Sequence, residues 1–164
     1  MTTDDIGEKL KQITLFKALM ERPDELQLVR DNLERKTLEK GAVIIEEGQD
    51  GDELFILLHG EIEILKHTTE GEPYTVAKLN DGMNVFFGEL ALVDRDKRSA
   101  TVRALTRCDL LVLNRTRFTA LGEKNPRLGW HLLSEIAGLL SKRLRKANED
   151  ALVLFETLVN ELAG

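Results

Sequence analysis

Three stretches of the chain differ in how apolar and polar residues alternate. In residues 3–31, Ile6, Leu10 and Ile13 recur at intervals of three or four, which indicates a helix with one apolar face. Pro23 interrupts this spacing, and a second short apolar stripe follows it. The pattern therefore predicts two helices at the amino-terminal end, which we expect to cover the edge of a sheet.

The middle of the chain, residues 33–114, is typical of short strands joined by tight turns. Glycines at 41, 48, 51, 60, 71, 82 and 88 separate runs rich in isoleucine, valine and leucine. Residues 54–58 are all apolar, which predicts burial on both faces, whereas residues 61–64 alternate, which predicts carboxylates outside and isoleucines inside. We expect a mainly β fold with flanking helices, an antiparallel jelly roll of about eight strands. The runs behind this expectation are 42–47, 54–58, 61–64, 74–79, 99–104 and 108–113.

The third stretch is helical. A short helix is expected over 115–123, and Asn125-Pro126 supplies the capping residue and the first-turn proline of a long carboxy-terminal helix. Apolar residues then recur in heptad steps, which favours a parallel two-helix homodimer, although a helix lying on its own roll uses the same pattern. We therefore divide the chain into a β-roll with its amino-terminal helices, residues 1–124, and a dimerisation helix, residues 125–164. The heptad residues are Leu133, Ala137, Leu140, Leu144, Ala147, Ala151, Leu154 and Leu158.

Residues 87–102 combine the groups needed to hold a small anion that also carries hydroxyls. Gly88 lets the backbone turn sharply and lets a ligand come close. The apolar run at 90–93 predicts one helical turn, whose first amide groups lack partners within the helix and can bind phosphate. Arg98 can bind the same phosphate through two parallel hydrogen bonds, and Glu89 can accept from a sugar hydroxyl or pair with an arginine. These residue types fit a ligand with one phosphate and one free ribose hydroxyl.

A specific resemblance rests on two runs, Phe87-Gly88-Glu89-Leu90-Ala91-Leu92 and Arg98-Ser99-Ala100-Thr101-Val102. They resemble the phosphate-binding cassette of the cyclic-nucleotide-binding domain family, which includes bacterial catabolite activator proteins and regulatory subunits of protein kinase A. The resemblance implies that Glu89 binds the ribose 2′-hydroxyl and that Arg98 binds the cyclic phosphate. It also implies a regulatory protein rather than an enzyme, which binds cyclic AMP, with cyclic GMP as the alternative, and whose terminal helices move on binding. The binding residues implied are Phe87, Gly88, Glu89, Leu90, Arg98, Ser99 and Ala100.

The chain departs from the family's pattern in several places. Lys97 stands where many members have proline, which predicts a less rigid loop. Two extra residues within 83–86 predict a bulge before the cassette and an altered pocket wall. Ser99 can bind phosphate or the amino group of a guanine, so it does not decide between the two purines. Asn148 falls about where the family's long helix meets the purine, but this helix is a turn longer, and neither Asn148 nor the basic run 142–146 is assigned to the ligand.

Composition excludes several other functions. A net charge of −6 over 164 residues argues against a dedicated nucleic-acid binder. Residues 148–164 are acidic and already belong to the heptad helix, so we do not expect them to form a helix-turn-helix domain. No apolar run approaches the roughly twenty residues of a membrane span, so we expect a cytoplasmic protein. The lone Cys108 cannot form an internal disulfide and is expected in the core. We expect no direct DNA binding, no membrane partner and an unidentified downstream protein partner.

Two rival functions remain. A β-roll also fits a metal-dependent cupin enzyme, but His59, His67 and His131 show no paired spacing, so neither a metal site nor catalysis is expected. The other rival is a structural or interaction protein with a vestigial nucleotide pocket, which acts through its long helix. Binding of a cyclic nucleotide separates this rival from a sensor.

Overall fold

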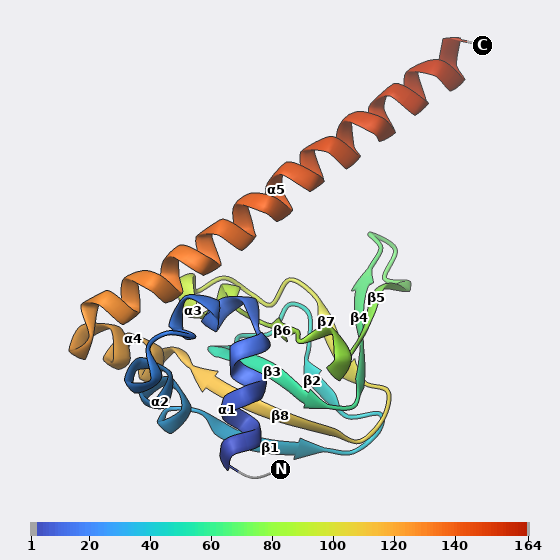
Figure 1. Cartoon of the computed structure of the whole chain (residues 1–164). Helices are drawn as coiled ribbons and strands as arrows, with labels where there is room; N and C mark the ends of the chain where they lie inside the picture. Colours follow the sequence, from blue (N-terminus) through green and yellow to red (C-terminus); the bar gives the residue numbers. More distant parts are fainter. Residues whose placement is uncertain (1–2, 164) are drawn as a thin grey trace.

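The computed structural model describes residues 3–163 and confirms a mainly β fold with flanking helices. Its strands are β1 (Glu34–Leu38), β2 (Val43–Ile45), β3 (Glu53–His59), β4 (Glu61–His67), β5 (Pro73–Asn80), β6 (Phe86–Phe87), β7 (Thr101–Ala104) and β8 (Cys108–Asn114). They pair antiparallel in two four-stranded sheets of order β1-β8-β3-β6 and β2-β7-β4-β5 (Figure 1). The jelly roll predicted from the sequence is therefore present.

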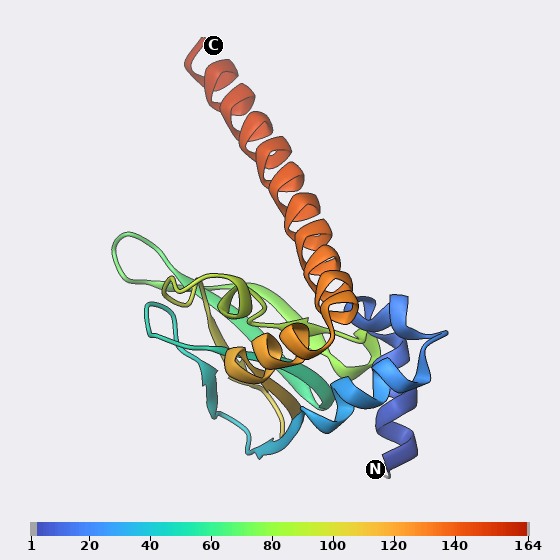
Figure 2. The ribbon, with the colours of Figure 1, turned by 90° about the vertical axis from the view of Figure 1, so that its left-hand side faces the viewer.

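Helices flank the roll at both ends of the chain. The amino-terminal ones are α1 (Thr3–Gln12), the 3-10 helix η1 (Thr14–Leu19) and α2 (Pro23–Asp31), and Figure 2 shows them in blue on one side of the sheets. A short 3-10 helix η2 (Asp81–Met83) and the single turn α3 (Leu90–Val93) flank β6. The chain closes with α4 (Arg115–Lys124) and the 38-residue α5 (Pro126–Ala163). No helix in the described part of the chain has both the length and the apolarity to cross a bilayer.

Strands β3 and β8 are buried on both faces because one sheet lies between two layers. Leu54, Ile56 and Leu58 of β3 pack in a core shared with the helices. The alternate residues Phe55 and Leu57 pack in a second core between the sheets. This two-sided burial confirms what the continuous apolar run at 54–58 predicts. Each fully buried leucine or phenylalanine side chain stabilises the fold by about 1.5–3 kcal/mol.

The structure corrects the sequence analysis in detail. Strands β1 and β6 were not among the predicted runs, and Ser99 and Ala100 precede β7 rather than opening it. The expectation of outward carboxylates is wrong for Glu63, which is buried because Arg103 on the neighbouring strand donates to it from Nε at 2.8 Å. A cross-strand ion pair can thus shield a residue that alternation alone assigns to the surface.

Helix α5 belongs to the roll at its start and leaves it further on. Leu128, Leu132 and Ile136 are buried in the core shared with the amino-terminal helices. Gly129 lies so close to Gly122 of α4 that an added Cβ would be 2.7 Å from the Gly122 Cα. From residue 141 to residue 162 every side chain is exposed, and Figure 1 shows this part projecting past the sheets.

Candidate functional site

The backbone at Gly88 forms the centre of the cassette. Gly88 has a φ of +77°, a left-handed conformation that favours glycine. A Cβ here would also lie 2.9 Å from the Glu53 carbonyl oxygen. The amides of Ala91 and Leu92 donate to the carbonyls of Gly88 and Glu89, at 3.2 and 3.0 Å, and close the turn that becomes α3. The sharp turn therefore brings the start of α3 next to β3.

The Arg98 guanidinium is held by backbone carbonyls on both sides. Nη1 donates to the Gly88 oxygen at 3.2 Å and Nη2 donates to the Glu53 oxygen at 2.9 Å. Gly51 makes room for it, since a Cβ at that position would lie 2.2 Å from the Arg98 Nε. Burial lowers the pKa of Arg98, and the charges of Glu53 and Asp52 act in the opposite direction. Arginine remains protonated at neutral pH, so a fixed positive charge sits at this point.

Glu89 is nearly fully buried, and its partner comes from the long helix. Arg143 of α5 donates from Nη1 to Oε1 of Glu89 and forms an ion pair with it. The sequence analysis allowed for an arginine beside Glu89 but did not identify Arg143. The only signal for it was the basic run 142–146, which reads equally well as a solvated helix face.

These groups open onto one cavity of about 450 Å³. Arg98, Glu89 and Arg143 line it together, and Ile64 and Leu79 form part of an apolar wall. The volume and the few converging polar groups suit a small-molecule ligand. All seven residues predicted from the sequence line this cavity: Phe87, Gly88, Glu89, Leu90, Arg98, Ser99 and Ala100.

Residues 35–125 match the family model of the cyclic nucleotide-binding domain. The chain belongs to this family. It is 32% identical to the cyclic AMP receptor protein of Thermus thermophilus over 155 residues, which is 94% of this chain and 68% of that protein. It is 38% identical to human cGMP-dependent protein kinase 2 over 97 residues, 58% of this chain but 12% of the kinase. The crystal structure of the Thermus thermophilus catabolite activator protein superposes with a TM-score of 0.76 at 30% identity, covering 86% of this chain and 62% of that one.

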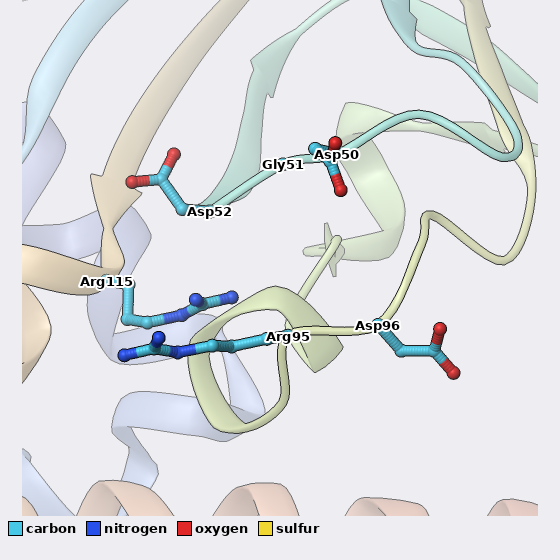
Figure 3. A pocket seen from close by; sticks show the side chains of 6 residues that line it. All are labelled: Asp50, Gly51, Asp52, Arg95, Asp96 and Arg115. Atoms are coloured by element: carbon cyan, nitrogen blue, oxygen red, sulfur yellow. The ribbon is translucent and has the colours of Figure 1, made fainter.

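A second, smaller cavity of about 390 Å³ adjoins the cassette of residues 87–102 (Figure 3). Within it Arg95 and Arg115 lie side by side, across from the loop that carries Asp50 and Asp52 (Figure 3). Arg115 donates from Nε to the Ala91 oxygen at 2.7 Å. Arg115 also donates from Nη2 to the Asp94 oxygen, so it holds the carboxy-terminal end of α3.

The departures from the family pattern have local solutions. Lys97, in place of proline, forms an ion pair with Asp50 at 2.7 Å, which ties the loop through a side chain. The segment before the cassette holds η2 and then Asn84 at φ +52°, and Lys9 of α1 donates to Asn84 Oδ1 at 2.7 Å. The two residue pairs that β6 makes with β3 are in regular register, so the predicted bulge does not lie in this strand. None of residues 83–86 lines the 450 Å³ cavity.

The histidines lie in separate places. His67 is hydrogen-bonded to Glu47 at 2.8 Å, His59 lies 3.4 Å from Asp81, and His131 is on α5. Between residues 3 and 163, no three histidine, cysteine, aspartate or glutamate side chains gather in a way that could hold a metal ion.

Proposed function

We propose that this chain is a non-catalytic, cytoplasmic sensor that binds cyclic AMP in the 450 Å³ cavity. The observation that carries the proposal is that Arg98 and Glu89 line one cavity beside the start of α3. An arginine held by two carbonyls is already placed for a phosphate before the ligand arrives, so little conformational entropy is lost on binding.

In this proposal each part of the ligand has its own partner. Arg98 and the Leu90 amide, the first of α3, bind the cyclic phosphate through charge-assisted hydrogen bonds; the next two amides of α3 close the turn instead. The free oxygen of the Glu89 carboxylate accepts from the ribose 2′-hydroxyl, and the purine lies against Ile64 and Leu79. Relatives named for cyclic AMP and for cyclic GMP both resemble the chain, and the one that matches 94% of it is a cyclic AMP receptor protein, which supports the adenine nucleotide.

We further propose a homodimer formed by residues 125–164 on a β-roll of residues 1–124, in which ligand binding repositions the terminal helices. Arg143 links the cavity to α5, and Lys9 links α1 to the segment that leads into the cassette. Both links connect a terminal helix to a residue at or just before the site. A change in the cassette on binding would therefore be transmitted to both helices, α1 and α5.

The rival proposal, an interaction protein with a vestigial pocket, also has an observation in its favour. Arg143 already occupies one oxygen of the Glu89 carboxylate, and such a pair could serve only to fasten α5 to the roll. In that case the cavity would have no nucleotide to bind. The two proposals differ in a single measurable property, stabilisation by cyclic nucleotide.

A thermal-shift titration tests the proposed function. Cyclic AMP at a hundred times its dissociation constant should add about 2.7 kcal/mol of stability, which raises Tm by roughly 5–10 °C in a chain of this size. Linear 5′-AMP serves as the control, because it has the same purine and sugar but a different phosphate. If neither cyclic AMP nor cyclic GMP raises Tm at millimolar concentration, the sensor proposal is wrong and the rival stands.

Gly51→Ala is expected to weaken cyclic AMP binding about tenfold with little loss of stability. The added Cβ would lie 2.2 Å from the Arg98 Nε, and the flexible end of the arginine would move away from the phosphate position. Titration calorimetry measures the affinity, and the Tm of the free protein measures stability. Gly7→Ala is the matched control, since nothing lies within 4 Å of a Cβ there. Equal affinity in both variants would show that Gly51 does not position Arg98.

A further inference from the structure

An apolar groove of about 540 Å³ lies beside the cassette, between α3, α4 and the start of α5. The turn α3 separates it from the nucleotide cavity: Leu90 and Ala91 line the cavity, whereas Leu92 and Val93 line the groove. Close approach of Gly122 and Gly129 joins the two helices that form the rest of it. Whatever occupies this groove therefore contacts the same short helix that shapes the nucleotide site.

The rim of the groove carries Trp130, the only tryptophan of the chain. Its side chain is 70% exposed, and Val93 and Leu133 beside it are each 44% exposed. An indole is a large apolar group that gains much by burial, and a contiguous exposed apolar patch of this kind marks an interaction surface. A projecting aromatic side chain next to an apolar groove gives this face both halves of a self-complementary contact.

The position of Trp130 on α5 points to the occupant. It lies three residues before Leu133 and so extends the heptad series by one step toward the start of the helix. The same series continues along the projecting part of α5, where Leu144 and Leu158 are exposed. In a parallel helix pair, residues at the same heptad position lie opposite each other. A second copy of the chain, paired in this way, would bring its own Trp130 to this groove.

We propose that two copies of the chain exchange Trp130 across a two-fold axis, each indole entering the groove of the other copy. The contact is isologous, with the same surface on both sides, as closed dimers require. It places the second copy's indole against Leu92 and Val93 of α3. Dimer contact and nucleotide site then share one helical turn, and any coupling between them is reciprocal. The exchange rests on the homodimer proposed above, and its coupling to the nucleotide site rests on the proposed binding of cyclic AMP; the exchange itself needs no nucleotide.

Sedimentation equilibrium and tryptophan fluorescence on the full chain test the exchange. Dilution from about 100 to about 0.1 μM should dissociate the dimer, red-shift the emission and increase quenching by acrylamide. Trp130→Ala removes the indole and Thr119→Tyr fills the groove from α4, and each should weaken the dimer at least about tenfold, as loss of a central anchor does. Tyr74→Ala, which truncates an aromatic residue of 49% exposure on β5, should leave it unchanged.

A protein that is monomeric at every concentration would overturn the proposal. So would a dimer in which acrylamide still reaches Trp130 and neither variant weakens association, since the two copies would then meet at another face. Repeating the titration with saturating cyclic AMP measures the coupling separately. If cyclic AMP does not bind at all, the proposed function fails, while the sedimentation and quenching results still decide the exchange.

Discussion

Arg98→Ala is expected to weaken cyclic AMP binding at least about tenfold, because each charge-assisted hydrogen bond to phosphate contributes about 1.5–3 kcal/mol. The guanidinium lines the cavity from a position fixed by the Gly88 and Glu53 carbonyls, and its loss removes this fixed pair of donors. Titration calorimetry gives the affinity directly. Arg98→Lys keeps a positive charge but lacks the planar pair of donors, and we expect it to bind with intermediate affinity.

The matched control is Arg95→Ala, which makes the same charge change three residues earlier in the same loop. Arg95 lines the 390 Å³ cavity but not the 450 Å³ cavity. The affinity of the Arg95→Ala variant for cyclic AMP should therefore stay within about twofold of that of the original protein. The Tm of each free variant shows whether the fold is intact. An Arg98→Ala protein that binds as tightly as the original would reject the site, and equal weakening in both variants would indicate a long-range charge effect instead.

Local signals made much of this structure predictable. The burial of β3 follows from five consecutive apolar residues, and the turn at Gly88 follows from a glycine placed just before a short apolar run. The cassette residues lie close together in sequence, so their order indicates their arrangement, and all seven line one cavity. In each case the residues that decide the structure are neighbours along the chain.

The features that could not be predicted depend on contacts between distant segments. Strand β6 has two residues, too few for any alternation to show, and it exists because β3 pairs with it. Burial of Glu63 depends on Arg103, a strand partner 40 residues away. Arg143 reaches Glu89 across 54 residues, and the way the start of α5 packs on the roll decides which residue of the basic run does so. Such contacts leave no periodic trace in the sequence.

Arg143→Ala is expected to destabilise the free protein by about 1–3 kcal/mol. The Glu89 side chain is 3% exposed, so removal of its cation leaves a buried carboxylate without a charged partner. The Arg143 side chain is 54% exposed and partly solvated, which places the loss below that of a fully buried pair. Denaturant unfolding measures the change, and Arg145→Ala, the same substitution on the exposed face, should alter stability by less than about 0.5 kcal/mol.

A double-mutant cycle isolates the pair from the individual side chains. Glu89→Gln removes the buried charge, so the added substitution Arg143→Ala should then have a smaller effect than it has alone. Additive losses in the double variant would mean that the ion pair stabilises nothing and that Arg143 acts only through its packing.

The same variant separates binding from transmission. If Arg143 carries the movement of the cassette to α5, saturating cyclic AMP should change amide hydrogen exchange over residues 139–150 in the original protein and in Arg145→Ala. In Arg143→Ala the nucleotide should still bind, since Arg98 and the Leu90 amide are intact, but hydrogen exchange over 139–150 should no longer respond to it. This follows because Arg143–Glu89 is the ion pair that joins the projecting helix to the cassette. A response that persists in Arg143→Ala would show that α5 senses the ligand through the packed core around Leu132 and Ile136 instead.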